Sequence, residues 1–350
     1  QVTINFEARQ KTDTRYIPAG WVVARDQFIV NDYPKMVLNA KSPATVTQNT
    51  ANLIFNGTDF SVIFDKESGV MTSYKCKGTE YISDHFGLKP FFWRASTDNE
   101  YGAGLPKKLN NWKKASYTEL KAENLNVKTG ENTIVSCDYR FPQTNTSWKV
   151  IYTIYKNGSI HVENAVDATK CDFPLIPRIG MRMQLPGEFV NAEYYGRGPW
   201  ANYEDRKTST FVDRYKSSII DMVDKYVMTQ ENAHHTDAAW LAVTLGSGKG
   251  MAFFADDKFQ FNVSNYLLET IANAEDWNND AAVGTAPKIK HINEYKPSDK
   301  VDLFIDYRMM GVGGNNSWGE WPMLPYRIIP KETNISYGFT LVPIDNINAV

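Results

Sequence analysis

The sequence has 350 residues, of which 42% are hydrophobic and 22% charged, a balance typical of a globular protein with a sizeable core. Its formal net charge is −2 and its basic residues are scattered, which argues against nucleic acid or an anionic membrane as a partner. No apolar run reaches the roughly 20 residues that a membrane-spanning helix needs.

Most of the chain alternates apolar and polar residues with a period of two, which predicts β-strands separated by turns. The Asn-Gly pair at residues 56–57 and the Lys-Asn-Gly-Ser run at 156–159 are strong hairpin signals, and residues 246–250 form a glycine-rich turn of the same kind. The strands are expected at residues 2–8, 21–30, 52–55, 60–64, 70–75, 148–155, 160–166, 239–245 and 251–255.

Helical periodicity is scarce in this sequence. Residues 264–277 are the best candidate for a helix, because Leu267, Leu268 and Ile271 can share one face. Residues 102–117 and 199–226 are expected to be long connections, which in compact β domains often build functional surfaces. The predicted fold class is therefore an all-β sandwich with long loops.

The chain is expected to contain three regions. Residues 1–34 are interpreted as closing strands of a preceding small β domain, 35–50 as a turn-rich linker, and 51–350 as one large β domain. The chain begins at Gln1, without a leader, inside an expected strand, so it is interpreted as part of a longer parent protein.

Three cysteines, Cys76, Cys137 and Cys171, are widely spaced and have no nearby histidine. This spacing argues against a disulfide framework and against a zinc site, and it predicts buried free thiols.

Glycoside hydrolysis needs two carboxylates, which lie roughly 5–5.5 Å apart in retaining enzymes. Several acidic pairs are candidates, but each has a structural explanation as a loop carboxylate that accepts backbone N–H groups or pairs with an arginine. No catalytic residue is expected among them: Asp98 and Glu100, Glu204 and Asp205, Glu231 and Asp237, Asp256 and Asp257.

His234 and His235, followed by Asp237, form the one local pattern that resembles a metal site. Adjacent residues on a strand point to opposite faces, so the two rings are not expected to share a ligand. We expect solvent exposure or loop packing for both histidines, and no metal in this chain.

A glycine-rich run at residues 311–314 lacks the frame of a phosphate loop and is expected to supply backbone positions with positive φ. It leads to Trp318, with Trp321 three residues further on. The loop either folds back on its own core or presents a ring to a sugar or to another domain, and the residues alone leave both interpretations open.

Four stretches carry recognisable motifs. Residues 92–102 read Phe-Trp-Arg-Ala-Ser-Thr-Asp-Asn-Glu-Tyr-Gly, and residues 195–206 read Tyr-Gly-Arg-Gly-Pro-Trp-Ala-Asn-Tyr-Glu-Asp-Arg. Residues 226–232 read Tyr-Val-Met-Thr-Gln-Glu-Asn, and residues 310–318 read Met-Gly-Val-Gly-Gly-Asn-Asn-Ser-Trp. In this order they resemble the C-terminal domain of the large bacterial β-galactosidases of glycoside hydrolase family 2.

The resemblance covers nearly the whole chain, because residues 19–28 also resemble the strand pair that closes the preceding immunoglobulin-like domain of that family. The chain departs from the family motifs at Ser96, Ala201, Thr229 and Asn315. These departures bear on substrate preference more than on fold.

The resemblance implies a large antiparallel supersandwich of the galactose-mutarotase type, preceded by closing strands of an immunoglobulin-like β-sandwich. For the parent protein it implies hydrolysis of terminal β-D-galactosides with retention, by glutamates on an upstream (β/α)8 barrel. Such a barrel needs about 250 residues of alternating strand and helix, which the period-two pattern excludes here. Magnesium is implied for that barrel, sodium is left open as a second ion, and no cofactor is expected in this chain.

The expected partners are a β-galactoside and the catalytic barrel of the same parent, and the parent is expected to be a homo-oligomer. A soluble protein is expected, with the bacterial cytoplasm and periplasm both open as compartments.

By its position in the motif, Trp318 is implied to stack on the substrate at the mouth of the active site. The other motif residues are expected to shape loops against the barrel, with direct contact to the sugar as the alternative: Arg94, Asp98, Asn99, Asn202, Asp205, Arg206, Glu231, Asn232, Asn315 and Trp321.

Two other functions stay open. One is a free-standing carbohydrate-binding module that uses an aromatic surface without catalysis. The other is an aldose mutarotase or epimerase, which needs His234, His235 or His291 paired with a carboxylate in the sandwich cleft.

Overall fold

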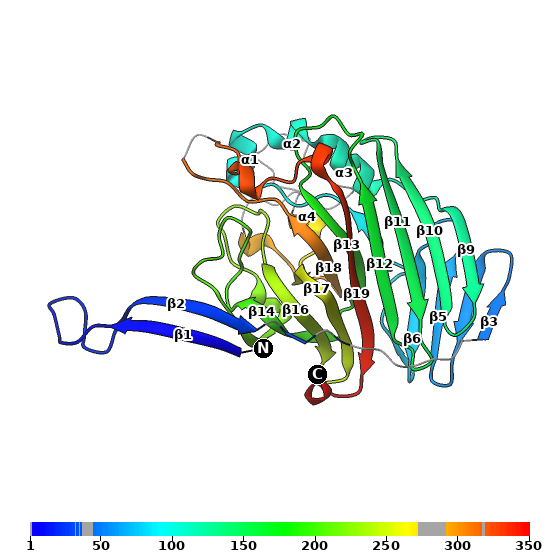
Figure 1. Cartoon of the computed structure of the whole chain (residues 1–350), viewed down its shortest axis with the longest axis horizontal. Coiled ribbons are helices and arrows are strands. Elements are labelled where there is room, and N and C mark those ends of the chain that lie inside the picture. The colour runs from blue at the N-terminus through cyan, green and yellow to red at the C-terminus, as the bar shows by residue number, and fades with distance from the viewer. Residues whose placement is uncertain (1, 32, 35, 37–44, 272–291, 317–318) are drawn as a thin grey trace. The chain divides into compact units, whose positions relative to one another are not determined.

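The computed structural model of the protein describes residues 2–31, 33–34, 36, 45–271, 292–316 and 319–350 (Figure 1). The chain divides into two compact units, Gln1–Val37 (unit 1) and Leu38–Val350 (unit 2).

Unit 1 contains the antiparallel strand pair β1 (Val2–Arg9) and β2 (Val22–Asn31), in which Ile4 lies opposite Phe28. The rings of Phe6 and Phe28 contact each other edge to face, with centroids 5.6 Å apart. Most side chains of the pair are exposed, and a two-stranded ribbon is only marginally stable in water by itself. Both strands were expected; their membership of an immunoglobulin-like sandwich stays a prediction.

Unit 2 begins with a five-stranded antiparallel sheet in sequential order: β3 (Thr45–Gln48), β4 (Asn52–Asn56), β5 (Phe60–Asp65), β6 (Met71–Cys76) and β7 (Thr79–Glu80). The hairpin expected at residues 56–57 joins β4 to β5. Strand β3 lies inside the stretch that was expected to be a linker. Four residues there alternate in the strand pattern, and Val46 packs against the core, so this part of the linker is a strand instead.

A twelve-stranded antiparallel sheet forms the larger part of unit 2. Its main path runs β15-β14-β16-β17-β19-β12-β11-β10-β9, while β18 pairs with β17 and β13, and β13 pairs with β8. The strands are β8 (Lys89–Phe91), β9 (Glu123–Thr129), β10 (Thr133–Phe141), β11 (Thr146–Ile154), β12 (Ile160–Asp167), β13 (Arg178–Pro186), β14 (Phe189–Gly198), β15 (Phe211–Ser218), β16 (His234–Leu245), β17 (Gly250–Ser264), β18 (Lys300–Met309) and β19 (Asn334–Ile344).

Both hairpins predicted within this sheet are present. Strands β11 and β12 meet at the 156–159 turn, where Gly158 has a φ of +84°, and β16 and β17 meet at a turn where Gly248 has a φ of +85°. L-amino acids other than glycine rarely adopt such angles. The predicted all-β antiparallel supersandwich is confirmed.

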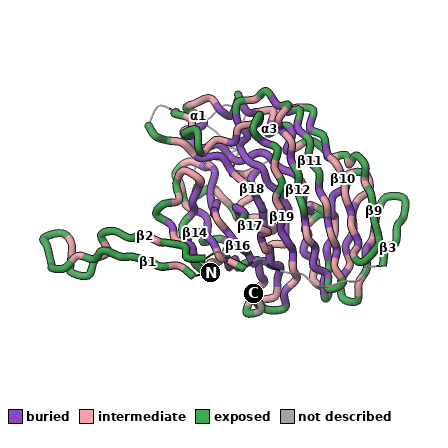
Figure 2. The backbone as a smooth tube through the Cα atoms, in the orientation of Figure 1, coloured by how far each residue is buried: buried purple, intermediate pink, exposed green. Residues whose placement is uncertain are grey.

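The core of unit 2 follows from the alternation along its strands, in which every second residue of β10 and β11 is buried (Figure 2). The Phe92 ring contacts those of Trp112, Phe141 and Trp148, with centroids 5.0–5.2 Å apart. Aromatic residues dominate such a core because each ring buries a large apolar area. All three cysteines are buried and unpaired, as predicted.

Three short helices lie in a stretch that was predicted mostly as a connection: α1 (Asp98–Gly102), α2 (Leu105–Lys108) and α3 (Asn110–Tyr117). They lie at one end of the large sheet (Figure 1). Helix α4 (Leu268–Ile271) falls within the helix expected at 264–277, but that helix does not begin at residue 264, because Ser264 ends β17 and residues 265–267 are not helical. Residues 272–277 of that prediction lie outside the described residues. Short 3-10 turns are η1 (Ile219–Met222), η3 (Ile292–Glu294), η4 (Leu324–Tyr326), η5 (Pro330–Glu332) and η6 (Ile347–Ala349).

Candidate functional site

The candidate site is built around residues 310–321, called the Gly-Trp loop here, which follows β18. The N–H of Met310 donates to the carbonyl of Pro177 at 3.0 Å, and the N–H of Gly311 donates to the carbonyl of Tyr326 at 2.8 Å. Gly313 and Gly314 have φ angles of +70° and +86°, as the sequence analysis expected. Trp318, implied as the substrate-stacking residue, lies outside the described residues, and the predicted residue Asn315 is exposed.

Arg94 fastens the beginning of the Gly-Trp loop. It is 1% exposed, and its guanidinium donates to the carbonyls of Met310 at 2.6 Å and Gly311 at 2.8 Å. The same group forms an ion pair of 2.9 Å with Glu100. The Glu100 carboxylate also accepts the N–H of Thr97 at 2.8 Å, in a capping box at the start of α1. A buried charge is tolerable only when it is paired and hydrogen-bonded in this way.

Asp205 holds the next part of the loop. Its carboxylate accepts the N–H groups of Val312 at 2.9 Å and Gly313 at 2.8 Å. Asn99 of α1 approaches Gly314 so closely that a Cβ added there would lie 2.5 Å from its Nδ2. A side chain at position 314 is therefore excluded both by space and by backbone conformation.

The far end of the loop also contacts α1. Gly319 has a φ of +76°, and a Cβ added there would lie 2.5 Å from backbone atoms of Gly102 and Ala103. Two residues later, Trp321 packs against the core, with Lys108 and Arg327 lying 5.1 and 5.5 Å from its ring centroid. At Trp321, therefore, the loop folds back on its own core, which is one of the two interpretations that the sequence left open.

Two of the other predicted residues connect neighbouring segments. Asp98 accepts a hydrogen bond of 3.1 Å from Gln230, which ties α1 to the segment before β16. Arg206 donates to the hydroxyl of Tyr226 at 3.1 Å. Sequence reasoning missed Gln230, although it stands inside the quoted 226–232 motif, because its partner is 132 residues away.

The remaining predicted residues hold backbone in place. Asn202 donates to the carbonyl of Trp200 at 3.0 Å and accepts the N–H of Thr236 at 2.9 Å. Asn232 accepts the N–H of Asp224 at 2.8 Å. The buried Glu231 carboxylate accepts a hydrogen bond of 2.9 Å from Asn262. Of the predicted set, Arg94, Asn99 and Asp205 contact the Gly-Trp loop directly.

The expectation that His234 and His235 are exposed or packed in loops is wrong. Both are fully buried on β16, because the ring of Tyr203 stacks on His234 and the rings of Tyr194 and Phe261 pack against His235. His234 contacts the side-chain oxygens of Asn262 at 2.9 Å and Gln260 at 3.0 Å. Burial lowers the pKa of His234 to about 3 and that of His235 to about 4.

The enclosure of these two rings argues against their use in the mutarotase alternative, since a general acid or base must reach its substrate. His291, the third histidine considered for that chemistry, lies outside the described residues.

Beneath the loop lies a buried network around Arg178, which forms an ion pair of 3.2 Å with Asp306. Burial raises the pKa of Asp306 to about 7, against the lowering effect of the Arg178 charge. Glu231 lies 4.0 Å from Arg178, and burial likewise raises its pKa. The network adjoins the segments that surround the loop.

Most of the carboxylates weighed as catalytic candidates have structural partners. Asp237 pairs with Arg197 and Lys207, and Asp256 lies 2.9 Å from a ring nitrogen of His161. Glu204 accepts a hydrogen bond from Gln260, and Asp257 is exposed. Within the part of the chain that the structure describes, no group of three or more His, Cys, Asp or Glu residues is arranged to hold a metal ion.

The described helices include none that is long and apolar enough to cross a membrane.

Comparisons with known proteins agree with the motifs. The profile of the beta galactosidase small chain family matches residues 56–341. The chain is 31% identical to the β-galactosidase of Priestia megaterium, over 98% of the chain and 32% of that protein, and 27% identical to that of Streptococcus thermophilus, over 95% and 31%. It thus spans about a third of the length of these relatives.

Among solved structures, a putative mutarotase from Salmonella typhimurium is similar with a TM-score of 0.44 and 9% identity, over 88% of this chain and 95% of that one. The family match extends over most of unit 2, including all four motifs that surround or form the Gly-Trp loop. The chain belongs to the beta galactosidase small chain family.

Proposed function

We propose that this chain is the part of a longer β-galactosidase that carries the Gly-Trp loop, and that Trp318 forms one aromatic wall of the pocket for a terminal β-D-galactoside. The observation that carries the proposal is the fixation of the loop on both sides of this residue. Arg94 and Asp205 hold its beginning, and Gly319 and Trp321 are held against α1 and the core. Binding groups are most effective when the surrounding structure orders them before the ligand arrives.

An indole suits this position chemically. One face of a galactopyranose ring presents C–H groups, and a flat aromatic ring covers such a face while excluding water from it. The contact is apolar and has no role in proton transfer. It therefore supports binding of the galactoside rather than cleavage of the glycosidic bond.

The acid/base and nucleophile carboxylates are assigned to the rest of the longer protein. In this chain, the Glu100 carboxylate is committed to Arg94, and that of Asp205 to two backbone N–H groups. Retaining hydrolysis needs two carboxylates that face the same glycosidic bond. The magnesium implied for the parent belongs to that same catalytic region.

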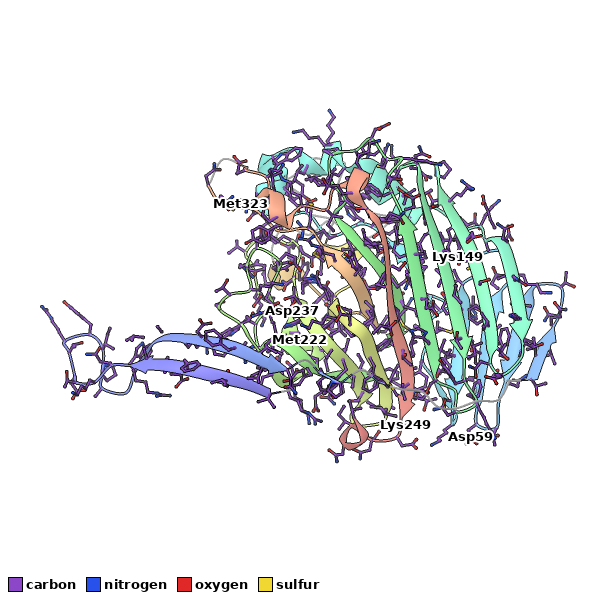
Figure 3. The ribbon with its side chains drawn as sticks, in the orientation of Figure 1. Asp59, Lys149, Met222, Asp237, Lys249 and Met323 are labelled. Carbon is purple, nitrogen blue, oxygen red and sulfur yellow. The ribbon has the colours of Figure 1, made fainter. Side chains whose placement is uncertain are left out.

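The catalytic region is also the proposed partner of the surface around the loop. Large apolar side chains are exposed on the loops of this region, including Trp200 and Val227, and Met323 with Leu324 at the end of unit 2 that carries α1 (Figure 3). Exposed apolar groups gathered on neighbouring loops are typical of a surface that another domain covers.

Equilibrium binding tests the proposed wall. In the longer protein, Trp318→Ala should weaken binding of a non-hydrolysable thiogalactoside about tenfold, because an aromatic contact of about 1–2 kcal/mol is lost. The affinity of Trp318→Phe should lie between those of Trp318→Ala and the parent, because part of the ring face remains. Tyr16→Ala, which changes an exposed aromatic residue of unit 1, is the matched control. Equal affinity of all four proteins would refute the proposal.

The assignment of catalysis elsewhere has its own test. The purified chain alone should release no nitrophenol from nitrophenyl β-galactoside, and polarimetry should show no acceleration of galactose mutarotation. Steady turnover in the first assay would place a catalytic pair within this chain, and acceleration in the second would favour the mutarotase alternative.

A further inference from the structure

A cavity lined by none of the Gly-Trp loop residues lies on the outer face of the five-stranded sheet. It has a volume of about 740 Å³, within the range of small-molecule sites. Half-buried residues of β4, β5 and β6 form part of its lining, and residues 84–89 and 117–120 complete it. We call this cavity the Lys89 groove, and its lining includes Asn52, Ile63, Asp65, Phe86, Lys89 and Glu119.

Lys89 provides a hydrogen-bond donor that no group among the described residues uses. It lies directly across from Arg182 in the β8–β13 pair, but the carboxylates of Asp302 and Glu269 are already committed to Arg182. In the described part of the chain, Lys89 Nζ has neither a hydrogen bond nor an ion pair, and lies 3.7 Å from the ring centroid of Phe86. Burial, and then the Arg182 charge, lower its pKa to about 8, so it is mostly protonated at pH 7.

Acceptor and amide groups line the same groove. The Oδ1 of Asp65 accepts two hydrogen bonds from Ser68, while its Oδ2 has no partner among the described residues. The exposed Glu119 carboxylate and the side-chain amide of Asn52 are likewise without partners there. A ligand in the groove thus meets an ammonium donor, carboxylate acceptors and an amide that both donates and accepts.

The charged side chains that line the groove limit the kind of ligand it can bind. The carboxylates of Asp65, Glu119 and Asp84 outnumber the single ammonium of Lys89, and Asp84 is paired with Lys300 outside the lining. Such a lining disfavours phosphate and other anions. The Lys89 ammonium would repel a simple cation. The Ile63 side chain on β5 offers the ligand an apolar contact.

We propose that the Lys89 groove binds a neutral saccharide, at a site separate from the Gly-Trp loop. Sugar hydroxyl groups would accept from Lys89 and donate to the carboxylates, and a C–H face would lie over Ile63. The role proposed for this site is attachment to a carbohydrate. The proposal does not depend on the role assigned to Trp318.

Methyl NMR spectra of the isotope-labelled chain test the groove directly, with galactose, lactose and a galacto-oligosaccharide as probes. At least one probe should shift the methyl signals of Ile63, Val70 and Leu120, which all line the groove. Lys89→Met should weaken that binding about tenfold or more, because it removes a charged donor and keeps the length of the side chain. Lys149→Met, at an exposed position on β11, should leave it unchanged.

Glu119→Gln gives an independent variant, because Glu119 is exposed and its change spares the core. Glu119→Gln should weaken binding by a smaller factor than Lys89→Met does. It tests the groove even where Lys89→Met impairs folding. The proposal is overturned when no probe shifts the three methyl groups, or when Lys89→Met and Glu119→Gln both bind as the parent does. Binding that Trp318→Ala abolishes and both groove variants retain would place the sugar at the Gly-Trp loop, against this proposal and in favour of the proposed function.

Discussion

Arg94 is buried in unit 2, and its charge is used three times: in the ion pair with Glu100 and in hydrogen bonds to two carbonyls of the Gly-Trp loop. A charge removed from water needs such an ion pair and hydrogen bonds to offset the loss of its hydration. Arg94 bonds to α1 through Glu100 and to the loop through Met310, so it connects two segments more than 200 positions apart in the chain.

Replacing this side chain should be costly. Arg94→Met leaves the Glu100 carboxylate buried without its partner, so the free energy of unfolding should fall by about 3–5 kcal/mol. Arg140→Met, which breaks an exposed ion pair with Glu123, should change it by about 1 kcal/mol or less. Urea unfolding of both variants measures the difference, and equal losses would contradict the role given to Arg94.

The buried histidines make stability depend on pH. His235 has a pKa of about 4 in the folded chain and about 6.5 when unfolded, so between these values the unfolded chain binds more protons. Its contribution is complete above pH 6.5 and is lost as the pH falls toward 4. Asp306, whose pKa is raised to about 7, acts in the opposite direction over part of this range.

A variant comparison isolates the histidine, because Asp306 is the same in both proteins. Between pH 7 and pH 5, His235→Gln should lose about 2 kcal/mol less stability than the parent, since each pKa unit corresponds to about 1.4 kcal/mol. Urea midpoints at the two pH values provide the measurement. His85→Gln, at an exposed position, should lose as much stability between the two pH values as the parent does. An equal loss for His235→Gln would contradict the role given to the buried His235 ring.

At the scale of elements, the Gly-Trp loop depends on groups from other segments, among them Arg94, α1 and residues 199–206. The Asp205 carboxylate accepts two backbone N–H groups of the loop, and hydrogen bonds to a charged acceptor are stronger than neutral ones. The loop beyond β18 should therefore be ordered by this residue more than by its own sequence.

Asp205→Ala should speed amide hydrogen exchange at Val312 and Gly313 about tenfold or more, while exchange in the strands stays unchanged. Mass spectrometry of the exchanged peptides resolves this segment. Asp257→Ala removes an exposed carboxylate on β17 and serves as the control. Protection of the two amides as in the parent would mean that Asp205 does not order the loop.

How well an element was predicted from sequence depends on how local its cause is. The 156–159 hairpin was predicted because Asn-Gly chemistry acts within four residues, and the glycines at 313 and 314 for the same reason. Helices α1 to α3 were missed because stretches of four to eight residues are too short to establish a period, although the capping box of Thr97 and Glu100 was readable.

What sequence reasoning could not reach is set by contacts between distant segments. The His234 ring is enclosed by Asn262 and Gln260 of β17 and by the stacked ring of Tyr203, and no local pattern encodes these distant partners. The same holds for the contact of Arg94 with the Gly-Trp loop and for the isolation of Lys89 over Phe86. The motifs indicated which residues belong to the site but not which partners they have.

At the scale of the whole molecule, the hydrophobic core lies in unit 2, while unit 1 exposes most of its side chains. Deleting residues 1–37 should therefore change the free energy of unfolding of unit 2 by less than about 1 kcal/mol, because no core residue is removed. Urea unfolding followed by tryptophan fluorescence compares the two chains. A clear loss of stability would show that unit 2 depends on the β1–β2 pair.

The central claim is that this chain contributes a binding wall, not a catalytic group, to a β-galactosidase. Steady-state kinetics of Trp318→Ala in the longer enzyme test it most directly, with nitrophenyl β-galactoside as substrate. The account predicts that KM rises about tenfold while kcat changes by less than about threefold, because a stacking contact mostly supports binding of the ground state. An unchanged KM, or a collapse of kcat at constant KM, would contradict it.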